Sequence, residues 1–474
     1  MNKYVLRVVI ASLICTINLH SATSKTFFKP RPILQDNVLE KSMSLHRSHT
    51  LKSKVDFQID NNFFYEQSTN KSDIKQYFFP DYKKSLAIKD AGASGTPDIS
   101  ADWLKIESSS FGDTFESKIR LSPVFRQCGV YTKLRKELDF VNKRLWVSAN
   151  LPFVEIKTNA NLREYDVLNQ QYKTNTTSDA NTNAAGALNN SLFLKYGKIN
   201  KGTQRLAGLA DIDFKFGYDF IQKEEKLFSF YGSLIIPTGY KPKCEYIFEP
   251  LIGNACHLGL GCGVHGDLNF FKDSENQLNI LGNLDYHYLF KSTELRSFDL
   301  ISNGPWSRYL LVFDQLTPGV VVSGINYFTK EMNITPRSTT NFLAAIHYKH
   351  KSFNFETGYN FWARECEKIS LRNPWSENIG IASATSANIQ SSATIATPRA
   401  TSAEGFNAIP ASNLNLNSAR HQSACSHKIF AAVDLSGKWK DYPVAVDLGA
   451  NYEFAPNNNV LAKWGLFLQL FFAI

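Results

Sequence analysis

The chain has 474 residues, of which 13% are aromatic, and its formal net charge is +9. The length would allow two or three soluble domains, yet no window beyond the amino terminus reaches the roughly eighteen apolar residues of a transmembrane helix. The positive charge does not gather in a stripe with interleaved aromatic residues, which argues against nucleic-acid binding.

The amino terminus carries the pattern of a secretory signal. Lys3 and Arg7 precede an uncharged stretch, and small residues at Ala22 and Ser24 follow it. This order of charge, apolar stretch and small-residue cleavage site predicts a signal peptide over residues 1–24. The apolar stretch is too short to span a bilayer as a helix, so the sequence predicts an exported protein.

The next segment, residues 25–98, has little periodicity and carries aromatic pairs such as Phe27-Phe28 and Phe78-Phe79 among charges and prolines. Its aromatic content is too high for a plain disordered tail. Two interpretations stay open: the segment plugs the lumen of the barrel predicted below, or it forms a small periplasmic appendage. We favour the plug.

From residue 99 onward, apolar and polar residues alternate in one stretch after another. In 277–290, for example, Leu284 and Tyr286 alternate with Asp285 and His287. A period of two indicates a strand with one apolar and one polar face. The same test predicts strands at 115–126, 144–157, 208–220, 226–237, 258–271, 318–329, 341–351, 353–364 and 428–438.

The chain ends in two long alternating stretches within 442–474. In the second, Leu466 and Leu468 share a face opposite Lys463 and Gln469. Long strands that end a chain on an aromatic-rich apolar face are typical of the closing hairpin of a transmembrane β-barrel. The sequence therefore predicts an all-β fold, a transmembrane antiparallel β-barrel over residues 99–474.

The strand count follows from barrel topology. Bacterial barrels keep both termini and the short turns in the periplasm and the long loops outside. With about twelve strands, the long segments 158–207 and 291–317 would lie in the periplasm. Two further strands, 100–109 and 306–315, remove this conflict and predict about fourteen strands. The external loops then include 365–427, whose Ala, Ser, Thr and Asn content marks low complexity.

The polar face of the strands is the part of the barrel that could carry a function. These residues either line a water-filled path or form a ladder of salt bridges in the wall, and both interpretations stay open. The lumen-lining candidates are Asp211, Asp213, Lys215, Asp219, Asp285, His287, Glu356, Asn360, Asp434, Asp447, Asn451, Glu453, Lys463 and Gln469. The sequence has no HExxH or GxSxG motif and no evident serine–histidine–acid spacing. We therefore expect no enzyme, no catalytic residue and no cofactor.

The cysteines suggest two disulfides. Cys366 and Cys425 lie at the ends of strands that should be antiparallel neighbours, which would close the base of the long loop. Cys244 and Cys256 lie in one external segment and form the second candidate pair. Reduced thiols are the alternative for both. Cys262 follows Cys256-His257 closely, but a strand would point it away from the neighbouring histidine at position 265, so we expect no metal site.

Signal, aromatic amino-terminal segment, about fourteen strands and long external loops together resemble the long-chain fatty acid and aromatic hydrocarbon transporters of the bacterial outer membrane. The resemblance covers residues 25–474 and rests on architecture. It implies a monomeric barrel whose amino-terminal segment folds into the lumen as a hatch. It also implies that the barrel captures an apolar ligand near its outer surface.

We accordingly expect an outer-membrane channel or transporter for a hydrophobic small molecule. The alternatives are a general diffusion porin and a structural or adhesive barrel that acts through its external loops. The expected partners are outer-membrane lipid, lipopolysaccharide and the barrel-assembly machinery, which would read the carboxy-terminal strand. The small-molecule ligand is not identified by the sequence.

Overall fold

A computed structural model describes residues 24–51, 55–90, 97–106, 114–169, 183–190, 192–223, 225–314, 321–376, 378–381 and 408–474. Apart from Ser24, the predicted signal peptide lies outside these residues. The central part of the predicted low-complexity loop, residues 382–407, lies outside them as well.

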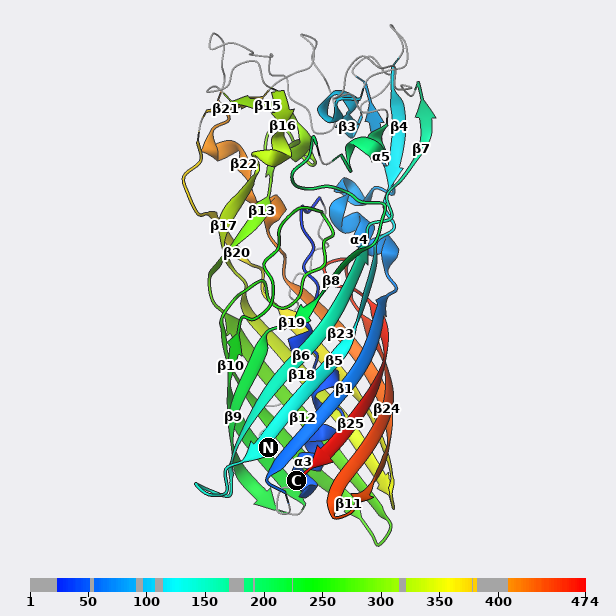
Figure 1. Ribbon diagram of the computed structural model, residues 1–474, viewed down its shortest axis with the longest axis vertical. Helices are drawn as coiled ribbons and strands as arrows, with labels where there is room; N and C mark the ends of the chain where they lie inside the picture. The colour runs from blue at the N-terminus through cyan, green and yellow to red at the C-terminus, as the bar shows by residue number, and fades with distance from the viewer. Residues whose placement is uncertain are drawn as a thin grey trace, which may run out of the picture.

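Twelve antiparallel strands form a closed barrel (Figure 1). A further strand, β8 (Gln204–Leu209), pairs with the upper part of β6 just ahead of β9. In order around the ring the barrel strands are β1 (Phe57–Ser68), β5 (Val124–Glu137), β6 (Leu145–Asn159), β9 (Ile212–Lys223), β10 (Lys226–Ile236), β11 (Gly259–Lys272), β12 (Asn276–Leu289), β18 (Arg337–His350), β19 (Phe353–Arg364), β23 (Ala424–Trp439), β24 (Tyr442–Phe454) and β25 (Lys463–Ala473).

The alternation in sequence produces an apolar outer face and a polar inner face. In β25, Leu466 is 51% exposed and Leu468 39% exposed, whereas Lys463 and Gln469 on the other face are at most 3% exposed. Successive side chains of a strand point to opposite faces of the sheet, so the exposed apolar side chains form one continuous outer surface. It includes Phe214, Phe216, Phe230, Leu260, Ile280, Leu284, Ile346, Val433, Leu448 and Leu470.

The barrel closes between its first and last strands. β1 pairs with β25 from Gln58↔Ala473 to Ser68↔Lys463, and with β5 on its other side. The segment 25–98 therefore contains a strand of the barrel wall and is not separate from it, which corrects the predicted domain boundary. The search for alternating residues did not find β1, because the inward Phe64 interrupts the alternation of apolar and polar residues within Phe63-Phe64-Tyr65.

The predicted count of about fourteen strands is corrected to twelve. Two barrel strands, β1 and β5, were missed; β5 carries charges on both faces, with Arg126 outside and Lys133 inside. Four predicted strands do not belong to the barrel. Their described parts lie within or beside short external sheets that are also half-buried and so produce the same alternation: 100–109, 115–126, 306–315 and 318–329. Residues 107–109, 315 and 318–320 lie outside the described residues, and 124–126 are the first residues of β5.

Four small sheets lie above the barrel at its long-loop end (Figure 1). The first contains β3 (Ile99–Ser100), β2 (Leu86–Lys89), β4 (Glu116–Arg120) and β7 (Arg163–Leu168). The second contains β13 (Ser292–Ser297), β17 (Thr329–Thr335) and β20 (Lys368–Leu371). The third contains β16 (Val321–Ser323), β15 (Leu311–Asp314) and β21 (Ile379–Ile381), and the fourth β14 (Asp299–Leu300) and β22 (Leu414–Asn415).

Short helices complete the described chain. α2 (Asn37–Lys41) and α3 (Ser44–Leu51) precede β1, and α4 (Lys71–Phe78), α5 (Ala184–Ala187) and α6 (Leu416–Ala419) lie in the external region. Single 3₁₀ turns are η1 (Ile33–Gln35), η2 (Pro80–Tyr82), η3 (Ala101–Leu104), η4 (Ser307–Tyr309), η5 (Gly324–Asn326) and η6 (Ala411–Asn413). Among the described residues, no helix is long and apolar enough to cross a membrane.

Candidate functional site

Residues 24–51, here called the interior segment, run along the inside of the barrel. At the long-loop end, the Lys25 amide donates to the Tyr77 carbonyl at 2.9 Å and the Thr26 amide to the Ser418 carbonyl at 3.2 Å. η1, α2 and α3 then follow among the strands, and α3 lies near the short-turn end (Figure 1). The interior segment thus contacts the protein over the full length of the barrel.

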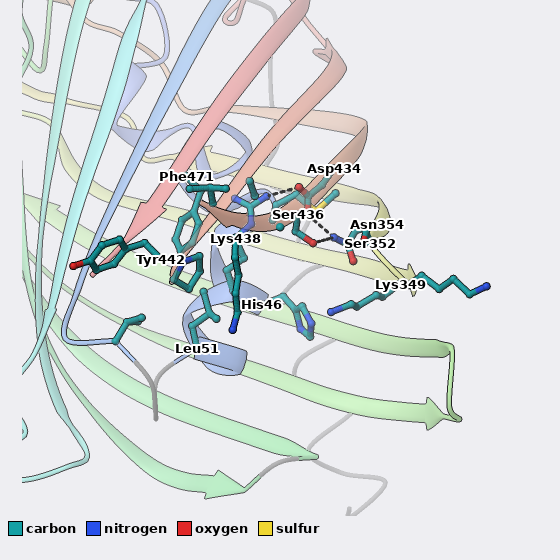
Figure 2. A pocket seen from close by; sticks show the side chains of 18 of the residues that line it. His46, Leu51, Lys349, Ser352, Asn354, Asp434, Ser436, Lys438, Tyr442 and Phe471 are labelled. Carbon is teal, nitrogen blue, oxygen red and sulfur yellow. Dashed lines mark hydrogen bonds and ion pairs between the residues drawn. The ribbon is translucent and has the colours of Figure 1, made fainter. Parts of the chain in front are cut away.

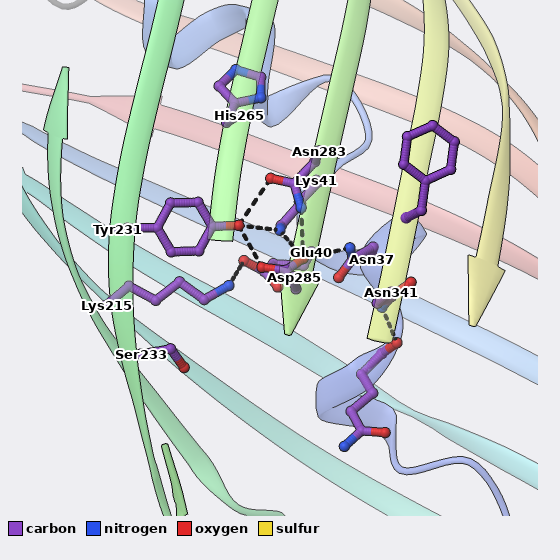
Figure 3. A network of polar contacts seen from close by, with 12 residues as sticks. Asn37, Glu40, Lys41, Lys215, Tyr231, Ser233, His265, Asn283, Asp285 and Asn341 are labelled. Carbon is purple, nitrogen blue, oxygen red and sulfur yellow. Dashed lines mark hydrogen bonds and ion pairs between the residues drawn. The ribbon is translucent and has the colours of Figure 1, made fainter. Parts of the chain in front are cut away.

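One group of contacts joins α2 to β9, β10 and β12. Lys41 Nζ lies 2.5 Å from Asp285 Oδ2 and donates to the Tyr231 hydroxyl at 3.0 Å (Figure 3). Glu40, on the preceding position of α2, forms an ion pair with Lys215. All five side chains are buried, so each charge is compensated by a partner from the other element rather than by water.

A second group lies higher in the barrel. The Arg31 guanidinium donates to Glu453 Oε1 at 2.9 Å and to Asn360 Oδ1 at 2.8 Å. Asp36 forms an ion pair with Lys428 of β23, and Lys428 also lies 2.8 Å from Glu66 of β1. Strands β19, β23 and β24 are therefore bonded to η1 and its flanking residues, and β1 is joined to them through Lys428.

A third group surrounds α3 at the short-turn end. Arg47 forms an ion pair with Asp447, and its Nη2 lies 3.4 Å from Asp434 Oδ1. His46 Nδ1 lies 2.9 Å from Asp267 Oδ2. The backbone amide of Met43 donates to the Glu356 carboxylate at 3.2 Å.

The charges of the strands and of the interior segment are complementary. Buried acidic side chains outnumber buried basic ones on the barrel strands, whereas the interior segment contributes several basic side chains. The buried strand acids are Asp60, Glu66, Glu137, Asp213, Asp219, Asp267, Asp285, Glu356, Asp434, Asp447 and Glu453; the buried strand bases are Lys133, Arg135, Lys215, Lys428 and Lys463. Lys25, Lys29, Arg31, Lys41 and Arg47 are the buried bases of the interior segment, against Asp36 and Glu40.

All fourteen residues that the sequence singled out are buried. Half of them bond directly to the interior segment: Lys215, Asp285, Glu356, Asn360, Asp434, Asp447 and Glu453. The other half are Asp211, Asp213, Asp219, His287, Asn451, Lys463 and Gln469, for which no bond to that segment is found among the described residues.

The second half bonds mainly to the barrel itself. Asp211, in the loop ahead of β9, accepts the Asn254 amide at 2.6 Å. Asp213 lies 3.3 Å from Lys215, and Asp219 accepts the Trp146 indole N–H at 2.9 Å. His287 bonds to Ser233, Lys463 to Glu66 and Gln469 to Asp60. The Asn451 side chain has no hydrogen-bond partner among the described residues.

The partners that sequence reasoning missed lie mostly on the interior segment and on β1. Arg31, Lys41 and Arg47 belong to a stretch without periodicity, so no pattern marked them as inward-facing. Asp60 and Glu66 lie on the unrecognised strand. The excess of acidic residues on the predicted inward faces could have indicated these partners, because buried acids on strands require compensating basic residues elsewhere in the chain.

The four candidate disulfide cysteines are free thiols, which differs from the predicted pairing. The residue opposite Cys425 in the ladder is Ala363, while Cys366 lies three residues further along and donates its thiol to the His421 carbonyl at 3.3 Å. Cys244 and Cys256 donate to different carbonyls, and burial raises the pKa of both thiols. No group of described residues could hold a metal ion.

A cavity of about 530 Å³, here called the inner cavity, opens at the short-turn end beside His46 and Leu51 of α3 (Figure 2). Its wall includes Met43 and His46 of the interior segment together with Lys349 and Lys438 of the barrel. Neither lysine has an acidic partner among the described residues. The cavity leads from the short-turn mouth up to the ion pairs of α3.

A closed antiparallel barrel leaves no unpaired strand edge, and its continuous apolar exterior suits hydrocarbon lipid. Long loops at one end, with short turns at the other end where the chain finishes, match the arrangement of bacterial outer-membrane proteins. The protein is accordingly a β-barrel of the bacterial outer membrane, and the interior segment lies where such barrels have a channel.

Comparison with known proteins finds no matching family model and no match among curated proteins. Solved structures with a similar fold include an outer-membrane channel from Pseudomonas putida F1, with 8% identity, 89% of this chain and 96% of that chain covered, and a TM-score of 0.37. The toluene transporter TbuX of Ralstonia pickettii has 6% identity, coverage of 96% and 99%, and a TM-score of 0.29. The translocator domain of the autotransporter NalP from Neisseria meningitidis has 8% identity, coverage of 92% and 97%, and a TM-score of 0.30. These similarities are too low to transfer a ligand to this chain.

Proposed function

We propose that the protein is an outer-membrane channel that the interior segment closes at rest and opens when it is displaced. The observation that carries the proposal is the set of buried ion pairs and hydrogen bonds from residues 31–47 to strands on all sides of the barrel. A segment so bound occupies the space through which a solute would pass.

The nature of the contacts favours a displaceable plug. A buried ion pair contributes little net stability relative to apolar packing, because desolvation of the charges offsets much of their attraction. Water can solvate both partners once they separate. Displacement of the interior segment would expose these charged groups to water together with buried apolar side chains such as Val38 and Leu39. The charged contacts therefore lower the free-energy cost of opening relative to a wholly apolar plug.

The same wall favours a polar solute. The sequence suggested a hydrophobic ligand, but the inward face of the strands carries many buried charges, such as Asp447 and Lys463, beside aromatic residues such as Phe430. An apolar molecule that crosses this interior would leave those groups without water or partners, which is costly. We therefore infer small hydrophilic solutes as the cargo. A permanently open diffusion porin would lack the ion pairs of the interior segment.

Single-channel recording in planar bilayers tests the proposal. We expect the full-length mature chain to be closed for most of the time and a variant that lacks residues 25–47 to conduct steadily. Lys41→Asp, which places a carboxylate beside Asp285, should increase the open time. Lys440→Asp is the matched control, because this lysine is exposed in the short turn between β23 and β24 and forms no hydrogen bond or ion pair with the interior segment among the described residues. Equal steady conductance of all four proteins would rule out the plug.

A further inference from the structure

A second depression, of about 860 Å³, lies outside the barrel at its long-loop end. We call it the outer groove. It runs between β17 and β20 on one side and residues 414–417, in β22 and α6, on the other. These elements lie directly above the barrel strands in Figure 1.

The outer groove faces away from the core of the protein. Asn333 pairs with Ser370 across the β17–β20 ladder, so these two side chains share a face. The neighbouring Met332 and Ile334 point to the opposite face and are fully buried in the core. The groove is therefore on the outer perimeter of the molecule, on the same side as the lipid-facing surface.

The height of the outer groove is set by the strands beneath it. Outward aromatic residues lie at the end of β12 and directly after it: Tyr286 is 42% and Phe290 38% exposed, and the Tyr286 hydroxyl bonds to Ser338 at 2.8 Å. Aromatic residues of this kind mark the membrane–water boundary of barrels. Lys291 and Arg337, which line the groove, follow directly after this boundary. The groove thus lies at the level of the outer-leaflet headgroups.

The lining of the outer groove has an uncompensated positive charge. Lys291, Lys368 and Arg420 have no acidic partner among the described residues, and only Arg337 has one, Glu365 at 3.2 Å. The carboxylate in the described lining, Glu367, is 3% exposed and is directed toward Lys29 and Arg296 instead.

Two observations around Arg420 favour an anion as the ligand of the outer groove. Its Nε is buried and has no hydrogen-bond acceptor among the described residues. Lys25 lies behind the groove, where its Nζ donates to the Asn417 carbonyl at 2.6 Å. Burial and the neighbouring Arg420 charge lower the pKa of Lys25 to about 8, so two cations lie close together at this edge of the groove.

We propose that the outer groove binds the phosphate groups of a phosphorylated glycolipid of the outer leaflet. Arg420 and Arg337 supply planar guanidinium groups for phosphate oxygens, and Lys291 and Lys368 supply point charges on either side. The side chains of Asn333 and Asn417 add amide donors. A lipid is favoured over a free phosphate because the groove opens sideways at headgroup level, next to the apolar face that would hold acyl chains.

The test measures binding of bisphosphorylated lipid A to the purified full-length protein in detergent, with dephosphorylated lipid A and inorganic phosphate as comparison ligands. The variant is Lys291→Gln/Lys368→Gln/Arg420→Gln. We expect at least about a tenfold rise in Kd, equivalent to ~1.4 kcal/mol, for the phosphorylated lipid. The control Lys143→Gln/Lys226→Gln/Lys440→Gln removes the same charge at the short-turn end and should stay within about twofold.

Three outcomes would overturn the proposal. The first is equal affinity for phosphorylated and dephosphorylated lipid A, and the second is an unchanged Kd in the groove variant. The third is displacement of the lipid by inorganic phosphate at comparable concentration, which would make the groove a site for soluble anions. The heat-modified shift of both triple variants on a gel establishes that their barrels are folded.

Discussion

At the scale of single residues, Asp285 connects the interior segment to the barrel wall. It accepts hydrogen bonds from Asn37 and Lys41 of the interior segment and from Tyr231 and Asn283 of the wall. Removal of one partner from a buried ion pair costs ~3–5 kcal/mol, because the other charge stays desolvated. Asp285→Asn should therefore destabilise the bound interior segment and raise the open probability in single-channel recordings.

The double variant Lys41→Met/Asp285→Asn provides the control for this prediction. It removes both charges, so no desolvated lysine remains, and the open probability should return toward that of the unmodified protein. If the single and double variants opened equally often, the pair between Lys41 and Asp285 would have no part in closure.

Asp90, next to β2 in the external region, should make the stability of the β2–β4 region depend on pH. Its carboxylate accepts the Phe115 amide at 2.6 Å, and burial raises its pKa to about 6. An acid whose folded pKa exceeds its unfolded value of about 3.9 binds its proton more tightly in the folded state. The stability of the β2–β4 region should therefore be highest below about pH 4 and fall as the pH rises through about 6.

Amide hydrogen exchange of β2 and β4, corrected for intrinsic rates, measures this loss of stability. Asp90→Asn keeps an acceptor for the Phe115 amide but cannot ionise, so its protection should be the same at pH 4.5 and pH 7. A pH response that persisted unchanged in Asp90→Asn would assign the effect to another group.

The inward residues of each strand could be predicted from that strand alone, because every second residue of a barrel strand points into the lumen and is buried there. Asp447 and Glu453 were found in this way because β24 alternates without interruption. Their partners, Arg47 and Arg31, were not predictable by that test. They lie on short helices and irregular turns, where no period relates neighbouring side chains, and only the folded barrel brings them to the acids.

At the scale of elements, long hairpins were predictable and the first strand was not. β24 and β25 follow each other closely, and each shows a full alternation. The partner of β25, however, is β1, about four hundred positions away, so no local signal predicts this pairing. The short sheets above the barrel misled the strand count because a half-buried external strand such as β4 has the same period as a lipid-facing one.

The ladder between β5 and β6 depends on a glycine. A Cβ atom at Gly129 would lie 2.1 Å from the Phe153 carbonyl oxygen, a backbone atom that cannot move without disturbing the β5–β6 pairing. Gly129→Ala should therefore destabilise the barrel by ~1–3 kcal/mol. Gly282→Ala in β12 is the matched control, because its Cβ would meet nothing within 4 Å. Urea unfolding in detergent compares the two, and equal midpoints would contradict the prediction.

Because the interior segment ends before β1 begins, two deletions of different length should have different effects on folding. Removal of residues 25–47 leaves β1 intact and should give a heat-modifiable barrel. Removal of 25–98 also deletes β1, so that β25 and β5 each lose a hydrogen-bonding partner inside the membrane, where unpaired backbone groups are costly. This protein should not fold. A folded barrel after the longer deletion would mean that the ring can close without β1.

At the scale of the whole molecule, the balance of charge depends on the interior segment. With that segment present, the basic groups of residues 29–47 offset the excess of acids on the strands. Without it, a path lined mainly by carboxylates remains, and rings of carboxylates favour cations. The variant that lacks residues 25–47 should therefore be cation-selective, as measured by its reversal potential in a KCl gradient. Anion selectivity would contradict this.

The pairing of β1 with β25 also fixes an order of events during biogenesis. The ring has a single seam that joins the two ends of the chain, and the interior segment precedes β1 and is enclosed by all twelve strands. Threading this segment through a finished ring would require its charged groups to cross the narrow lumen. The chain avoids that step if the strands wrap around the segment and the seam forms last. The interior segment is then enclosed while the barrel assembles, and its contacts with the strands can guide the curvature of the barrel wall before the wall closes.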